Sequence, residues 1–63
     1  MTKEQINFEI QRLKDKVEIE ESNYKRALEL RKEYKVLRQI RENIKSLKHN
    51  LEALIKQQTI ANS

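Results

Sequence analysis

Hydrophobic residues near the start of the chain recur at the spacing of an α-helix. They stand four, three and four residues apart, which places them on one side of a helix, whereas a β-strand would divide them between two faces. These residues are Ile6, Ile10, Leu13 and Val17. Thr2 and Gln5 precede them at the spacing of a capping box, in which each side chain satisfies a free backbone donor of the first turn. The pattern predicts a first helix from about Lys3 to Glu20.

A longer apolar stripe follows, with steps of three or four residues and no polar member. It consists of Tyr24, Ala27, Leu30, Tyr34, Leu37, Ile40, Ile44, Leu47, Leu51 and Leu54. Its mean step of about 3.3 residues is shorter than that of a heptad, so a coiled coil along it is expected to be locally overwound. The stripe predicts a second helix from Tyr24 to about Gln58, followed by a frayed tail at residues 59–63.

The two stripes differ in phase, which predicts a break between them. At its own spacing the first stripe would continue through Glu20 and Arg31, which are both charged. A run of weak helix formers, Ser22 and Asn23, lies between the two stripes. We therefore expect a short loop at about residues 21–23, with Ser22 or Asn23 capping the second helix.

Two alternatives to this plan stay open. One is a single unbroken helix, because the chain has no glycine or proline to enforce a turn. The other is a further break at His49 and Asn50, with Asn50 capping a short third helix. Phe8 and Ile19 lie nearly opposite the first stripe, and we expect them either to contact a second partner or to remain partly exposed.

The predicted helices differ in length, and this difference predicts association. At 1.5 Å per residue they would measure roughly 27 Å and roughly 52 Å, so the first would cover only about half of the second stripe. The part from Ile44 to Ile55 would then be bare in a monomer, and an exposed apolar stripe of this size marks an interface. We expect an all-α helical hairpin that forms a homodimer through the stripe from Tyr24 to Leu54. The dimer would be an antiparallel coiled coil or a four-helix bundle, and a groove or helix on another protein is the alternative.

Composition restricts the ways in which so short a chain becomes stable. A chain of 63 residues forms one domain at most, and it buries only roughly 60% of its unfolded surface. Disulfides need cysteine, which is absent, and one histidine is too few for a zinc site, so oligomerisation remains. We expect no metal and no cofactor. No segment approaches the ~18 apolar residues of a membrane span or contains the core of a signal peptide, which favours a cytoplasmic location.

Charge is distributed unevenly along the chain. Residues 1–23 carry four basic and six acidic side chains, a net charge of −2, whereas the remainder carries ten basic and four acidic side chains, a net charge of +6. The basic ridge consists of six cations, each one residue after an apolar position: Arg31, Lys35, Arg38, Arg41, Lys45 and Lys48. Such a ridge would suit the phosphates of RNA or DNA. Alternatively, its long side chains cover the edge of the apolar stripe and pair with acidic residues of the first helix.

The sequence contains no recognisable catalytic constellation. Its carboxylates are intermixed with Lys and Arg, as on a solvated helix surface, and a two-helix chain is not expected to form a catalytic pocket. His49 stands among polar residues and belongs to no motif. We therefore expect a protein that is not an enzyme.

Residues 22–37 carry a pattern of an aromatic residue, an alanine three residues later, Leu-Arg, and further apolar positions. The residues are Tyr24, Ala27, Leu30, Arg31, Tyr34 and Leu37. This segment resembles the UVR motif, a helical hairpin that docks excision-repair subunits on one another and occurs in chaperone ATPases and their adaptors. It departs from the motif at Lys25 and Lys32, where the family usually has acidic residues, and at Leu28, which replaces a small residue. The resemblance implies protein docking; the fragment from Tyr24 to Glu29 also looks like the second helix of a tetratricopeptide unit.

The expected function is a non-enzymatic protein–protein interaction module or small adaptor that acts through a self-associating apolar seam. The alternative is a small basic helical dimer that binds RNA or DNA through the ridge from Arg31 to Lys48, similar in size and architecture to plasmid copy-number regulators that bind paired RNA loops.

Overall fold

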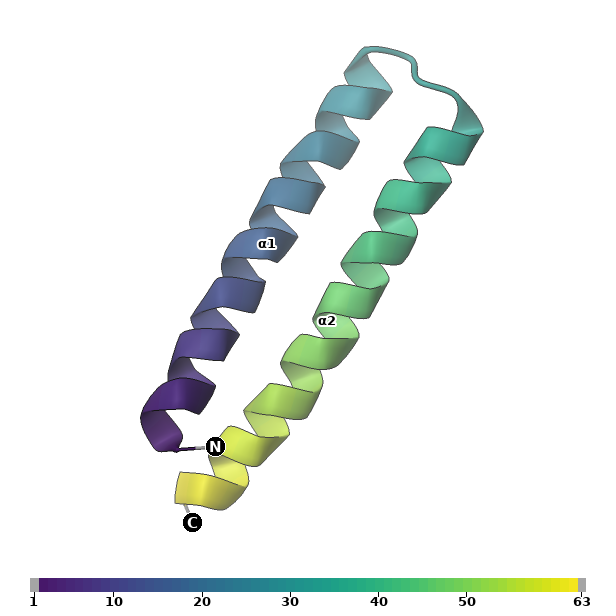
Figure 1. Cartoon of the computed structure of the whole chain (residues 1–63). Coiled ribbons are helices and arrows are strands. Elements are labelled where there is room, and N and C mark those ends of the chain that lie inside the picture. Colours follow the sequence, from purple (N-terminus) through teal and green to yellow (C-terminus); the bar gives the residue numbers. More distant parts are fainter. Residues whose placement is uncertain (1, 63) are drawn as a thin grey trace.

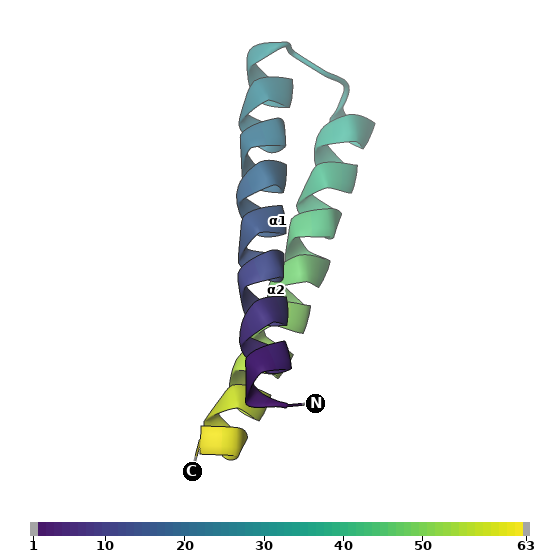
Figure 2. The same ribbon diagram turned by 60° about the vertical axis from the view of Figure 1, so that its left-hand side comes forward.

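Two helices of similar length lie antiparallel and side by side (Figure 1). The computed structural model describes residues 2–62, in which α1 spans Lys3–Glu29 and α2 spans Tyr34–Asn62. A second view shows the helices slightly inclined to each other and joined by the loop at one end (Figure 2). The predicted all-α hairpin is thereby confirmed.

The start of α1 is the predicted capping box. The backbone N–H of Gln5 donates to the hydroxyl oxygen of Thr2 at 3.2 Å, and the backbone N–H of Thr2 donates to Oε1 of Gln5 at 2.9 Å. Two backbone donors that the helix leaves without a partner are therefore satisfied by two side chains.

The predicted loop at residues 21–23 is wrong, because α1 continues through it to Glu29. The first stripe does not stop at Val17: at the same four-three spacing it runs on to Tyr24, which is half-buried, and Ala27, which is buried. Packing of these two residues on α2 outweighs the weak helix propensity of Ser22 and Asn23, whose side chains are exposed. Neither of those two residues begins a helix.

The turn lies instead at residues 30–33 and is built without glycine. The N–H of Lys32 donates to the carbonyl of Ala27 at 3.0 Å, and the N–H of Arg31 donates to that of Leu28 at 3.1 Å. These two bonds form a Schellman motif, in which the residue after the C-cap takes a left-handed conformation. That residue is Arg31, with φ of 54°. The carbonyl of Glu33 then accepts from the N–H of Leu37 at 3.2 Å and begins α2.

The second helix is continuous from Tyr34 to Asn62. The alternative break at His49 and Asn50 is not present, and neither is the alternative of one unbroken helix. The expected frayed tail is also wrong for residues 59–62, which are helical, whereas Ser63 lies outside the described residues.

The helices are matched in length, which corrects the prediction of a short and a long helix. They contain 27 and 29 residues, about 40 Å and 43 Å of helix. α1 therefore extends along the whole apolar stripe of α2, and the predicted bare half does not exist. The predicted overwinding is wrong for the same reason, because the step of about 3.3 residues came from joining the stripes of two helices across a turn.

The positions that face the other helix repeat at alternating steps of three and four in both helices. In α1 they are Ile6, Ile10, Leu13, Val17, Glu20, Tyr24 and Ala27. In α2 they are Leu37, Ile40, Ile44, Leu47, Leu51, Leu54 and Gln58. This heptad spacing keeps one side of each helix against the other, with Ala27 and Leu37 near the turn and Ile6 and Gln58 at the open end.

Candidate functional site

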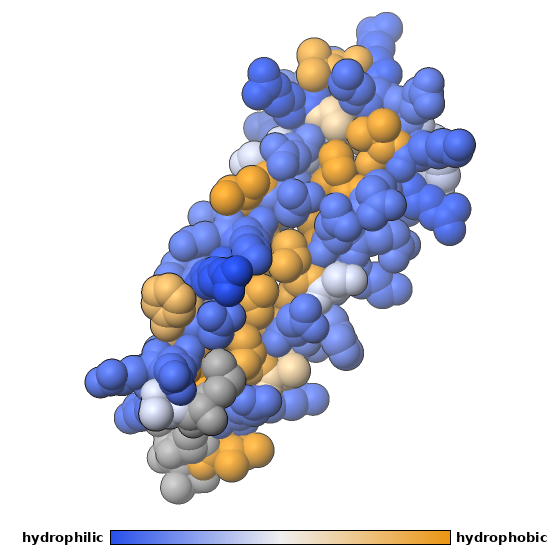
Figure 3. Space-filling view, viewed as in Figure 1, coloured by the Kyte–Doolittle hydropathy of each residue, from blue (hydrophilic) through white to orange (hydrophobic). Residues whose placement is uncertain are grey.

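Only part of the apolar seam between the helices is shielded from solvent. The four buried side chains of the described residues all belong to α1, and they are Ile6, Ile10, Val17 and Ala27. Every seam residue of α2 is only half-buried. On the face shown in Figure 3, apolar side chains form a strip that follows the groove between the two helices. The seam of a two-helix hairpin has one helix on each side and no further element above or below it. Both edges of the seam are therefore exposed to solvent.

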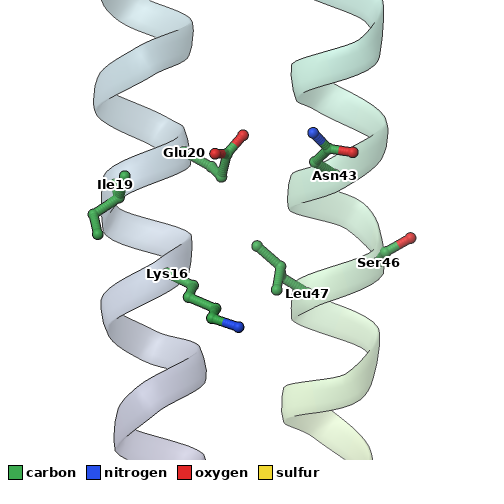
Figure 4. A pocket seen from close by; sticks show the side chains of 6 residues that line it. All are labelled: Lys16, Ile19, Glu20, Asn43, Ser46 and Leu47. Carbon is green, nitrogen blue, oxygen red and sulfur yellow. The ribbon is translucent and has the colours of Figure 1, made fainter.

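The groove contains an open hollow at the middle of the hairpin. This hollow has a volume of about 430 Å³ and is lined by Lys16, Ile19, Glu20, Asn43, Ser46 and Leu47. Leu47 points from α2 toward α1, while Glu20 points from α1 into the space between the helices (Figure 4). Figure 3 is viewed as Figure 1, with α1 on the left and running upward, and in Figure 4 Lys16 lies below Glu20 on the left-hand helix, so both figures view the same side of the hairpin.

The edges of the seam of α2 differ in charge. The neutral flank borders the groove and contains no charged residue: Val36, Gln39, Asn43, Ser46, Asn50, Ala53 and Gln57. The opposite edge carries Arg41 and Lys48, which line a separate hollow of about 250 Å³ with Glu21 of α1. Burial of the neutral flank would therefore cost far less desolvation than burial of the other edge.

The structure brings four residues of the basic ridge together. Arg38, Arg41, Lys45 and Lys48 follow one edge of α2 and are exposed, whereas Arg31 lies in the turn and Lys35 at the start of α2. In the part of the chain that the structure describes, one ion pair is found. It joins Nη1 of Arg12 to Oε1 of Glu9 at 3.4 Å and involves no residue of the basic ridge. The expected pairing of the ridge with acidic residues of α1 is therefore not found.

The predicted interface residues divide between the two helices. Tyr24 and Ala27 lie on α1, and the six residues from Leu37 to Leu54 lie on α2, where they face α1. Leu30 lies in the turn and Tyr34 begins α2, and they are 60% and 67% exposed. The segment that resembles the UVR motif thus covers the end of α1, the turn and the start of α2.

Phe8 and Ile19 lie on the outside of α1 and are 69% and 59% exposed. Within the hairpin the second of the two expected outcomes, partial exposure, therefore holds. Ile19 also lines the groove, so it borders the apolar strip. Phe8 and Ile19 line a shallow hollow of about 300 Å³ along the outer side of α1.

The hairpin exposes more surface than a compact monomer of its size. Its accessible surface is 5362 Å². The scaling of folded monomers predicts about 4300 Å² for a chain of this mass. The excess of about 1000 Å² follows from the elongated shape, with extents of 46 × 14 × 14 Å along the principal axes.

Four groove residues were not identified from the sequence: Lys16, Glu20, Asn43 and Ser46. The available signal was the continuation of the first stripe beyond Val17, which places Glu20 on the seam and Lys16 at its edge. Glu20 is half-buried, and Nδ2 of Asn23 donates to its Oε1 at 3.4 Å. A polar residue in an apolar seam is a known means of selecting one register and one oligomeric state.

Residues 2–62 contain no group of three or more His, Cys, Asp or Glu side chains that could hold a metal ion. His49 is exposed. Neither helix, over its described length, is both long and apolar enough to cross a membrane.

Comparisons of the chain with protein-family models, with curated proteins and with solved structures gave no match.

Proposed function

We propose that this chain is a non-enzymatic protein–protein interaction module that acts as a self-associating helical hairpin in the cytoplasm. The observation that carries the proposal is the excess surface together with the open apolar strip. About 1000 Å² of excess area is slightly more than the roughly 800 Å² that each partner contributes to a standard interface. Pairing of two hairpins into a four-helix bundle would cover the half-buried residues of α2. The resemblance to the UVR motif supports the same class of function, a docking module or small adaptor.

The test is the solution mass by light scattering over a concentration series, with helix content followed by circular dichroism on the same samples. We expect a helical dimer. A helical protein that stays monomeric throughout the series would contradict self-association. A poorly helical monomer would instead indicate that the seam requires a different protein.

Substitution of one seam residue separates association from general surface effects. Leu47→Asp places a carboxylate in the half-buried seam, so it should abolish the dimer and most of the helix content. Leu28→Asp makes the same change at a side chain that is 49% exposed near the turn, and should leave both nearly unchanged. A Leu47→Asp variant that remains dimeric and helical would refute the proposal.

The second candidate function is binding of RNA or DNA through the basic ridge. It is favoured by the exposure of the six cations and by their lack of ion pairs within residues 2–62. Binding should weaken steeply with salt, because each neutralised phosphate releases counterions. Arg38→Glu combined with Lys45→Glu should remove binding of a labelled RNA hairpin and a labelled DNA duplex while the dimer persists. If the wild-type protein binds neither probe at low salt, this candidate is eliminated.

A further inference from the structure

Burial of the groove beside the neutral flank should cost less desolvation than burial of the basic edge of α2, because its α2 side carries no charged residue. On its α2 side it is bordered by seven uncharged residues, of which Ser46 and Ala53 are small. On its α1 side, Glu9 and Arg12 are already paired with each other. The charged groups left at the middle of the groove are one cation, Lys16, and one half-buried anion, Glu20.

Lys16 and Glu20 form no ion pair with each other within the described part of the chain. Their charged ends diverge along α1, as Figure 4 shows, although a spacing of four residues would allow contact. One positive and one negative group, displaced along the same helix, make a patch that is complementary to itself when the second copy runs in the opposite direction. Self-complementarity under a two-fold rotation is the requirement for a symmetric dimer interface.

We infer that the occupant of this groove is a second copy of the same hairpin, related by a two-fold axis that crosses both helices at the level of Ser46. This inference deepens the proposed function and rests on it. The rotation sets α1 antiparallel to α1 and α2 antiparallel to α2. Lys16 of each copy then meets Glu20 of the other, and the small Ser46 lies next to its own counterpart.

The remaining surface of the hairpin fits this arrangement. The basic ridge is on the opposite edge of α2, so it stays in solvent on both copies and is not brought into like-charge contact. The polar amides of Asn43 and Asn50 stand at similar distances before and after Ser46 on the neutral flank. Antiparallel pairing brings each of them to the other across the two α2 helices, where amides both donate and accept hydrogen bonds.

The charge contact is tested by mixing two variants. Lys16→Glu gives two like charges on each hairpin, and so does Glu20→Lys, so each variant alone should raise the dissociation constant of the dimer about tenfold. An equimolar mixture should recover the wild-type dissociation constant to within about threefold, because every contact across the axis is then between opposite charges. Pairing within one hairpin cannot be restored by mixing, so recovery identifies a contact between copies.

The position of the axis is tested by cross-linking, for which the absence of native cysteine is convenient. Ser46→Cys should form an intermolecular disulfide under mild oxidation, because only a residue near the axis approaches its own counterpart closely enough. Lys45→Cys is the matched control: Lys45 is exposed, adjacent in sequence and on the opposite edge, so this variant should remain reduced.

The outcomes separate this inference from the proposed function. A monomeric wild-type protein overturns both. The arrangement alone is overturned, with self-association intact, by a wild-type dimer in which the mixture stays as weak as the single variants. The same conclusion follows if the Lys45→Cys variant forms the disulfide and the Ser46→Cys variant does not. Circular dichroism of each variant verifies that the hairpin is folded, and the cross-linking test stands even where Glu20→Lys fails to fold.

Discussion

The side-chain amide of Gln58 donates a hydrogen bond to Oδ1 of Asn7, joining the C-terminal part of α2 to the start of α1 across 51 residues of sequence. The Schellman turn fixes the helices relative to each other at one end of the hairpin, and this bond does so at the other. Gln58 occupies a seam position, so the apolar strip ends at this polar residue. Its bond to Asn7 also favours one register of the two helices.

Removal of this bond should destabilise the hairpin slightly, and the effects of substituting its two partners should not be additive. Asn7→Ala and Gln58→Ala are each expected to lower the free energy of unfolding, with a coupling energy of about 0.5–1 kcal/mol, the net value of a hydrogen bond near the surface. Urea unfolding followed by circular dichroism at one fixed protein concentration gives the free energies of unfolding of the wild type, the two single variants and the double variant, from which the coupling energy follows. Gln57→Ala, next to Gln58 but off the seam, should show no coupling with Asn7→Ala.

The capping box at the start of α1 should contribute measurably to stability. Thr2→Ala removes the acceptor for the N–H of Gln5 and should lower the free energy of unfolding by about 1 kcal/mol, whereas Thr2→Ser should retain it. Lys3→Ala is the control at an adjacent exposed position, and it should change stability little. Equal effects of Thr2→Ala and Thr2→Ser would contradict the role of the hydroxyl group.

Shortening a side chain to alanine should destabilise the protein strongly on the inner side of α1 and very little on the outer side. Ile10 is 6% exposed and Phe8 is 69% exposed, although they stand two residues apart. Ile10→Ala should lower the free energy of unfolding by about 2–4 kcal/mol, which is much of the stability of so small a chain. Phe8→Ala should be close to neutral, and thermal unfolding of both variants decides the matter. A strong destabilisation by Phe8→Ala would instead reveal that the outer side of α1 is covered in the assembled protein.

Much of this fold was readable from spacing alone. The capping box, the stripe from Ile6 to Val17 and the α2 seam from Leu37 to Leu54 all lie where the sequence predicts them. These features depend on local periodicity, which survives folding because each helix buries one side. The hairpin itself follows from the change of phase between the two stripes.

The position of the turn was not readable in the same way. Tyr24 and Ala27 fit both stripes, so spacing alone places them in the second helix, and the charged Glu20 hides the continuation of the first stripe. The turn itself contains Leu30, Arg31, Lys32 and Glu33, none of which is a usual turn residue. Steps of four and three residues alternate strictly from Ile6 to Ala27 and again from Leu37 to Gln58, and the alternation fails only between Ala27 and Leu37. This interval is the sequence signal for the turn. Groove residues such as Lys16 and Ser46 could be recognised only after the pairing of the helices was known.

Arg31 has a left-handed backbone conformation, which is unfavourable for a residue with a Cβ atom, and this feature yields the last prediction. A side chain with a Cβ atom costs roughly 1–2 kcal/mol in this region of backbone space, and glycine avoids that cost. Arg31→Gly should therefore raise the free energy of unfolding by up to about 1 kcal/mol, the rest being offset by the greater freedom of glycine in the unfolded chain.

Two controls isolate the backbone effect of Arg31→Gly. Arg31→Gln removes the same positive charge and keeps the Cβ atom, so it should not stabilise the protein. Lys32→Gly introduces glycine at the next residue, where φ is not positive, and should destabilise it. If Arg31→Gln stabilises the protein as much as Arg31→Gly does, the cause is relief of charge repulsion within the basic ridge, because both variants remove the charge and only one removes the Cβ atom.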